Sequence, residues 1–195
     1  MTVGVPRTSP IIPAAPERPP IYLDPVVGWA LVLALTSRVA LAIASWFSLR
    51  AFPRLPFYDG QAPDWFFPEN PSLDGWVRWD AAHYINLALH GYGEGNPSPG
   101  LGWGFFPLYS LLMRGLTEAL FLPVTERNLA LAGLVISNLC FIALVVLVAR
   151  WSARLFGDEA ARSTILLLCL SPFAFFFNAA YTESLFLLLV VATGA

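Results

Sequence analysis

Asp80 and His83 are the residues of this sequence best suited to acid–base chemistry, since they stand three positions apart in a stretch with helical periodicity. Residues three apart on a helix share a face, so the carboxylate and the imidazole point the same way. A carboxylate can take the proton of a hydroxyl as that hydroxyl attacks, and histidine can act as acid, base or ligand. Asp80 also suits a plainer role as N-cap of the helix, and the two roles are compatible.

Four other residues are candidates for binding a charged substrate. Arg78 adjoins Asp80, and Arg38 lies in the middle of an apolar run. Arginine can bind phosphate through two hydrogen bonds, although Arg78 could also reach toward the membrane surface and Arg38 could pair with another helix. Tyr181 and Glu183 belong to a polar break between two apolar runs, where an interfacial structural role competes with substrate binding. Polar residues around Asp80 match no standard metal-ligand spacing, which leaves a divalent cation open and predicts no certain cofactor.

The composition restricts the elements that can position these residues. The chain has 195 residues, of which 57% are hydrophobic and only 12% are charged, with a mean hydropathy of +0.64. Soluble domains carry about 25% charged residues, so this chain cannot cover a comparable surface in water. A net charge of -2 also provides no basic field for nucleic acid. The sequence therefore predicts an all-α membrane protein with multi-pass transmembrane helices.

Apolar runs and proline density divide the chain. Residues 1–25 are rich in proline, which predicts a disordered tail, and residues 26–195 form the transmembrane part. At about 1.5 Å per residue, a run of about 20 residues crosses a bilayer. Four runs are predicted as spans, the last of them incomplete: 26–47, 127–149, 163–177 and 184–195.

The loop between the first two spans, residues 48–126, is predicted to lie on the outer side of the membrane. The apolar spacing of Ala81, Tyr84, Ile85 and Ala88 predicts an interfacial helix over 81–90. Residues 104–121 either span the membrane or form a second interfacial helix. Arginines favour the cytoplasmic side. If 104–121 does not span, the N-terminal tail and the loop from Arg150 to Arg162 share the cytoplasm, so we favour the interfacial alternative. Asp80, His83 and Glu183 then meet on the outer side.

Several short motifs carry a family resemblance. In order, they are Thr36-Ser37-Arg38, Arg78-Trp79-Asp80-Ala81-Ala82-His83-Tyr84, Gly91-Tyr92, Phe105-Phe106-Pro107-Leu108-Tyr109, Ser171-Pro172 and Tyr181-Thr182-Glu183-Ser184. Together they resemble the PIG-V family of membrane mannosyltransferases over roughly residues 30–195. Leu108 and Ser110 depart from the family pattern, at positions that carry no reacting group.

The resemblance implies a GT-C-like architecture, of which this chain would be the N-terminal portion. Such enzymes transfer a sugar from a polyprenyl-phosphate carrier at the outer or lumenal face, with inversion. Asp80 would be the catalytic base with His83 beside it, and Arg78, Arg38, Tyr181 and Glu183 would bind substrate. The expected partners are membrane lipid, the polyprenyl-phosphate sugar donor and a glycolipid or glycan acceptor, without nucleic acid.

Two other functional classes remain open from the sequence. A transporter or flippase would place ionisable groups deep in several spans, whereas here the polar residues gather in one loop. A non-catalytic membrane subunit is the third reading. The absence of lysine hints at a GC-rich bacterial genome and hence the plasma membrane; a eukaryotic relative would lie in the endoplasmic reticulum membrane.

Overall fold

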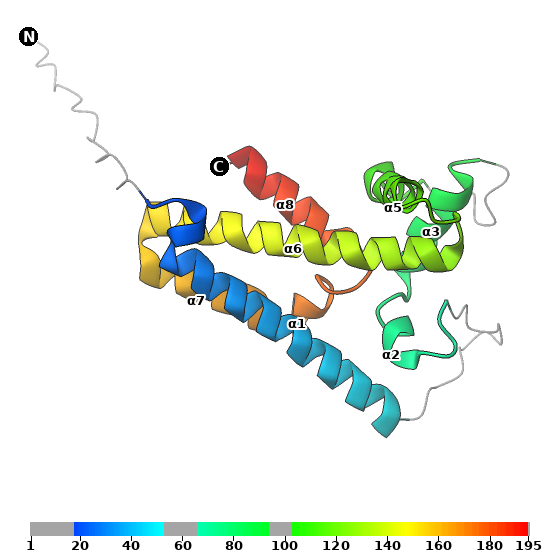
Figure 1. Cartoon of the computed structure of the whole chain (residues 1–195), viewed down its shortest axis with the longest axis horizontal. Helices are drawn as coiled ribbons and strands as arrows, with labels where there is room; N and C mark the ends of the chain where they lie inside the picture. Colours follow the sequence, from blue (N-terminus) through cyan, green and yellow to red (C-terminus); the bar gives the residue numbers. More distant parts are fainter. Residues whose placement is uncertain (1–17, 53–65, 94–102, 195) are drawn as a thin grey trace, which may run out of the picture.

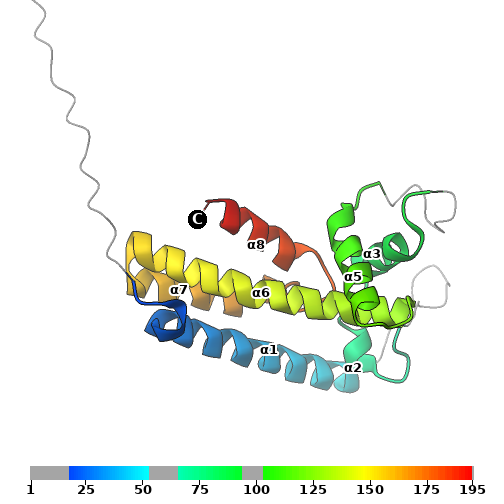
Figure 2. The ribbon, with the colours of Figure 1, turned by 45° about the horizontal axis from the view of Figure 1, so that its top comes forward.

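The computed structural model describes residues 18–52, 66–93 and 103–194, and every regular element in these ranges is helical. This confirms the predicted all-α class. Figures 1 and 2 show the helices around one long central helix, α6. The predicted tail over residues 1–17 lies outside the described ranges.

Two long helices form the frame of the molecule, namely α1 (Pro25–Ala51) and α6 (Glu126–Phe156). By length and composition, both are long and apolar enough to cross a membrane. Each helix extends beyond the predicted span that it contains, 26–47 for α1 and 127–149 for α6. The buried residues of α1 all fall in its first half, up to Arg38. Figure 1 accordingly shows α1 close to α6 near its start and apart from it toward α2.

The predicted span 163–177 is shorter in the structure. Helix α7 (Asp158–Leu170) has 13 residues, about 20 Å of helix and too short to cross a bilayer. It ends before Ser171 because the residue preceding a proline is driven out of the helical region, and Ser171 is extended at ψ 144°. The 3-10 turn η2 (Pro172–Phe175) follows, and α8 (Glu183–Gly194) forms the last apolar helix.

Because α7 ends early, the polar break at residues 178–183 packs alongside α6. The Ser137 hydroxyl, eleven residues into α6, donates to the Tyr181 carbonyl at 2.8 Å. The break therefore contacts the interior of α6, away from its first residue.

Two shorter amphipathic helices pack near the first residues of α6. Helix α3 (Asp80–His90) lies within one residue of the predicted 81–90 and ends at Gly91, whose φ of +68° suits glycine. Helix α5 (Pro107–Ala119) has 13 residues, fewer than the predicted 104–121. Figure 1 shows α5 nearly end-on where α6 lies across the view, so α5 runs across α6 as an interfacial helix would.

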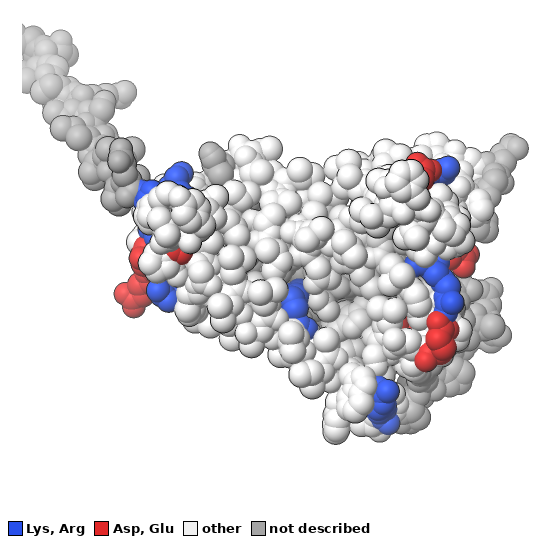
Figure 3. Space-filling view, viewed as in Figure 1, with Lys and Arg blue, Asp and Glu red and all other residues white. Residues whose placement is uncertain are grey.

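The opposite end of the molecule joins the chain's first described residues to the α6–α7 connection. Arg18 pairs with Asp24 and with Asp158, at 2.9 and 2.7 Å. Residues 18–25, predicted as disordered tail, are therefore ordered up to the start of α1 and include the turn η1 (Ile21–Leu23). The charge rule placed both segments on the cytoplasmic side of the membrane, and that placement stays a prediction. Figure 3 shows charged side chains gathered at the two ends of a largely uncharged middle, which one basic patch interrupts.

Candidate active site

Two segments far apart in sequence meet where α3 begins. The Ala180 amide donates to the Trp76 carbonyl at 2.9 Å, and the Tyr181 hydroxyl donates to the Arg78 carbonyl at 2.9 Å. These bonds bring Asp80 near Glu183, and the two carboxylates interact electrostatically. The sequence placed these carboxylates together on the outer side of the membrane, and that placement stays a prediction.

Asp80 is exposed and unengaged. Helix α3 begins at Asp80 itself, and its N-cap is Trp79, without a side-chain capping bond. The predicted N-cap role of Asp80 is therefore wrong by one position. Among the described residues, no hydrogen bond or ion pair engages its carboxylate. Its oxygens are left available to a substrate.

Glu183 is the half-buried partner of Asp80 at the start of α8. Its Oε2 is buried and has no hydrogen-bond partner in the described part of the chain. Burial is the largest influence and raises the pKa of the Glu183 carboxyl; the residue's own backbone N–H lowers it by less, and the negative charge of Asp80 adds a still smaller increase. Glu183 therefore holds its proton more readily than an exposed glutamate does.

An aromatic wall borders the two carboxylates. The His83 ring stacks on Phe105 with centroids 4.7 Å apart, and Phe105 meets the edge of Tyr84 at 5.0 Å. The Tyr84 hydroxyl is hydrogen-bonded to the Thr182 side chain, and burial raises the pKa of Tyr84 to about 12. The sequence placed Tyr84 only on the apolar face of the predicted helix, and Thr182 was not among the predicted site residues. Its place in the Tyr-Thr-Glu motif was the available signal.

A buried hydrogen-bond chain supports the site from α6. The Tyr109 hydroxyl donates to the Gly133 carbonyl at 2.8 Å and lies 2.7 Å from the Ser137 hydroxyl, which donates to Tyr181. A Cβ at Gly133 would approach the Tyr109 hydroxyl to 3.2 Å, so glycine permits this close packing. Tyr181 is only 3% exposed. Its side chain therefore positions the site rather than facing an open surface.

The two arginine candidates have opposite surroundings. Arg78 forms an ion pair with Asp74, the buried last residue of α2 (Pro71–Asp74), so its charge is already engaged within the fold. The four-residue spacing of this pair was a signal in the sequence. Arg38 is 9% exposed, and none of its guanidinium nitrogens has a hydrogen-bond partner among the described residues. The guanidinium carbon lies 4.0 Å from the centroid of the Phe141 ring.

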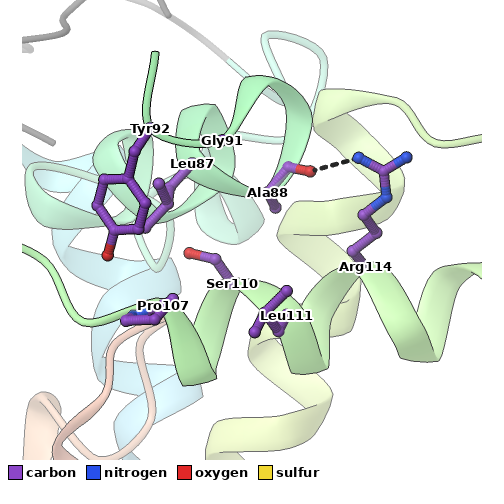
Figure 4. A pocket seen from close by; sticks show the side chains of 8 residues that line it. All are labelled: Leu87, Ala88, Gly91, Tyr92, Pro107, Ser110, Leu111 and Arg114. Atoms are coloured by element: carbon purple, nitrogen blue, oxygen red, sulfur yellow. Dashed lines mark hydrogen bonds between the residues drawn. The ribbon is translucent and has the colours of Figure 1, made fainter.

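A hollow of about 180 Å³ lies between α3 and α5. Figure 4 shows the Arg114 side chain reaching from α5 to the Ala88 carbonyl on α3, a bond of 3.2 Å. The Ser110 hydroxyl makes a second link, to the Tyr84 carbonyl at 2.8 Å. These links hold α3, and with it Asp80, against α5.

A metal site finds no support in the described ranges, where no group of three or more histidine, cysteine, aspartate or glutamate residues is placed to hold an ion. The open carboxylate of Asp80, the half-buried carboxyl of Glu183 and the adjoining hydroxyls can bind a polyol and take a proton from it. The buried Arg38 of α1 lies beside Phe141, farther along α6 than Ser137.

The helical packing with two candidate spans, and a pair of carboxylates beside two short amphipathic helices, define the class as a helical membrane protein with a polar site. The family model for Mannosyltransferase (PIG-V) matches residues 68–194. The chain belongs to this family, which confirms the resemblance in its motifs.

Curated relatives extend the comparison. The chain is 29% identical to "GPI mannosyltransferase 2" of Drosophila pseudoobscura pseudoobscura over 171 residues, which cover 79% of this chain and 37% of that protein. It is 35% identical to "GPI alpha-1,6-mannosyltransferase 2" of Mus musculus over 121 residues, 58% of this chain and 23% of the relative. The matched part is thus well under half of the relatives' length. No solved structure matches this chain.

Proposed function

We propose that the protein transfers mannose, or a related hexose, from a polyprenyl-phosphate donor to a hydroxyl of a glycolipid or glycan at the outer face of a membrane. The observation that carries this proposal is the exposed, unengaged carboxylate of Asp80 within the region matched by the mannosyltransferase family. The names of the relatives support a mannosyl donor and a glycolipid acceptor.

The chemistry follows from the position of Asp80. The acceptor oxygen attacks the anomeric carbon as its proton passes to the Asp80 carboxylate. The bond from the anomeric carbon to the phosphate oxygen breaks, and its electron pair leaves with the lipid phosphate. Attack from the face opposite the leaving group inverts the anomeric centre. His83, one turn along α3 and stacked on Phe105, hydrogen-bonds the acceptor.

The leaving phosphate requires a cation in a place with little water. Arg78 is less suited to this role than Arg38, because its guanidinium is paired with Asp74. Arg38 lies near Phe141, one helical turn from the Ser137 that supports the site, and its donors are unused within the described residues. Arg38 is therefore the proposed phosphate-binding residue, with Arg78 holding the loop before Asp80.

An apolar groove supports a lipid-linked donor. A hollow of about 410 Å³ lies between α6, α7 and α8, with Leu144, Leu167 and Leu187 among its lining residues. Phe177, another wall residue, stacks on Phe141 at 5.3 Å, and Phe141 in turn contacts Arg38. An isoprenoid chain in the groove would thus lie one aromatic ring away from the cation proposed for its phosphate.

The proposal is tested with membranes that contain the protein, supplied with labelled polyprenyl-phosphate mannose and a glycolipid acceptor. We expect label to enter the acceptor fraction. Absence of transfer, with the protein folded and the donor shown to reach it, would favour the alternative of a non-catalytic subunit. Movement of unmodified donor across the bilayer would favour a flippase instead.

A further inference from the structure

Arg38 is a buried cation whose hydrogen-bond donors are unused. It lies near the middle of α1 and is 9% exposed. None of its three guanidinium nitrogens has a hydrogen-bond partner among the described residues. The guanidinium carbon lies 4.0 Å from the centroid of the Phe141 ring, and a cation–π contact of this kind uses no N–H donor. The N–H donors of Arg38 therefore remain for a ligand.

No carboxylate within the described ranges balances the charge of Arg38. The titratable group that acts on it there is the Cys169 thiol of α7, which is 2% exposed. A thiol in apolar surroundings is neutral and supplies no counter-charge. Asp80 and Glu183 act on each other instead. A buried charge without a partner is costly, so an anionic ligand gains more at this position than at an exposed arginine.

The surroundings of Arg38 favour an anion that carries an apolar chain. Phe141 stacks on Phe177 with ring centroids 5.3 Å apart, and Phe177 belongs to the wall of the hollow of about 410 Å³ between α6, α7 and α8. A lipid phosphate at Arg38 can extend its chain into this hollow. A free inorganic phosphate has no chain with which to use it.

The charge of such a lipid phosphate changes during the proposed transfer. The donor is a phosphodiester with a single negative charge and two free oxygens. When the bond to the anomeric carbon breaks, its electron pair stays on the phosphate oxygen, and the acceptor's proton passes to Asp80. The product is a phosphate monoester with a charge of about −1.5 to −2 at pH 7 and three free oxygens. Arg38 thus faces more negative charge after the reaction than before it.

We propose that Arg38 binds polyprenyl phosphate, the monoester product, more tightly than a phosphodiester of the same chain, so that the product is retained as a competitive inhibitor of the donor. This inference rests on the proposed function and describes the regulation of its donor site. Burial strengthens the distinction, because water and salt screen charges at an exposed arginine. An interaction that grows as the phosphate leaves also favours bond breaking, and slow product release is its consequence.

Three lipids of equal chain length isolate the headgroup: polyprenyl phosphate, polyprenyl methyl phosphate and polyprenol. Their binding to purified protein in phosphatidylcholine nanodiscs is measured from pH 5 to pH 8, a range that contains the second ionisation of a phosphate monoester near pH 6. Inorganic phosphate serves as a competitor without a chain. Arg38→Met removes the cation. Arg50→Met is the matched control, because Arg50 also lies on α1 over an aromatic ring, Trp46 at 4.1 Å, but is exposed.

We expect wild-type protein at pH 8 to bind polyprenyl phosphate about tenfold or more tightly than its methyl ester, the size of one additional charge-assisted hydrogen bond. This preference should shrink toward pH 5 as the monoester takes up its second proton. Arg38→Met should bind the two phosphates equally within about twofold, whereas Arg50→Met should keep the wild-type preference. Polyprenol should bind most weakly, and inorganic phosphate at an equal concentration should displace none of the lipids.

Equal binding of the two lipid phosphates by wild-type protein, or a preference that survives in folded Arg38→Met, would overturn the proposal. Displacement by an equal concentration of inorganic phosphate would overturn the assignment of a lipid ligand. If Arg38→Met does not fold, Arg38→Lys replaces it; loss of the planar fork should lower the affinity for polyprenyl phosphate severalfold, and an unchanged affinity would count against Arg38.

Binding and transfer separate this inference from the proposed function. Transfer that added polyprenyl phosphate does not inhibit in competition with the donor would overturn the inference and leave the proposed function intact. Selective, Arg38-dependent binding of polyprenyl phosphate without transfer to any acceptor would show that the proposed function fails while the phosphate site stands.

Discussion

The Tyr181 hydroxyl donates a hydrogen bond of 2.9 Å to the carbonyl oxygen of Arg78, across 103 positions of sequence. This bond joins the segment before α8 to the residue that lies two positions before Asp80. With the Ala180–Trp76 bond beside it, it sets the separation between Asp80 and Glu183. A buried tyrosine thus positions the two carboxylates.

Tyr181→Phe should keep the packing of the ring on Phe176, whose centroid lies 5.8 Å away, and lose the hydroxyl bond. We expect the unfolding free energy to fall by about 1 kcal/mol, the usual effect of one hydrogen bond. The turnover number should fall while KM for both substrates stays the same. Tyr22→Phe, at an 83% exposed site, is the control and should change neither. A raised KM with unchanged stability would instead indicate that the Tyr181 hydroxyl contacts substrate.

Arg38→Met tests the proposed phosphate contact. The variant should raise KM for the polyprenyl-phosphate donor by about tenfold, because a charge-assisted hydrogen bond is lost. Its unfolding free energy without substrate should stay within about 1 kcal/mol of wild type, since loss of the cation–π contact offsets relief from an unpaired buried charge. Destabilisation by about 3–5 kcal/mol would indicate that Arg38 is one partner of a buried ion pair, which would contradict its role as an unpaired cation that binds phosphate.

The helices of this protein were largely predictable from local sequence. The apolar runs of α1 and α6 are long enough to be recognised by length and hydropathy alone. The spacing of Ala81, Tyr84, Ile85 and Ala88 predicted α3, and all four are buried in the structure. Local patterns were sufficient here because α1 and α6 are apolar around their whole circumference over a long run, whereas α3 buries the stripe that its own periodicity defines.

The depth and partners of the site residues were not predictable in the same way. A single residue, Pro172, shortens α7 and moves the polar break into the interior of α6, although the apolar run continues to residue 177. Whether Arg78 or Arg38 has a partner depends on tertiary packing. Asp74 engages Arg78, and among the described residues no carboxylate reaches Arg38.

Trp79 has a backbone conformation that favours glycine, with φ of +49° and ψ of −114°. Its side chain is 65% exposed, so packing contributes little to the choice of residue. Trp79→Gly should therefore unfold with a free energy about 1 kcal/mol higher than Trp79→Ala, which keeps the strain. Denaturant titration in detergent compares the two variants. Equal stability, or a more stable alanine variant, would show that this backbone is not strained.

Asp24 provides a test of stability against pH at the other end of the molecule. Its bonds from Arg18 are chiefly responsible for lowering its carboxyl pKa below the usual value near 3.9. Because this pKa is lower in the folded state than in the unfolded state, the ionised carboxylate stabilises the fold at pH values above the unfolded-state pKa. That stabilisation is lost as the pH falls through the folded-state pKa. Asp24→Asn should thus cost about 2 kcal/mol at pH 7 and progressively less below about pH 4. An equal cost at pH 7 and pH 3 would contradict this assignment.

The most direct test of the account is the Asp80→Asn variant in the labelled mannose transfer assay. Asparagine preserves the size and hydrogen-bonding capacity of the side chain at the exposed first position of α3, so folding should be unchanged. Loss of the general base should lower the turnover number by a factor of about 10²–10⁴, with donor binding preserved. Transfer by folded Asp80→Asn at the wild-type rate would contradict the role of Asp80 as the base.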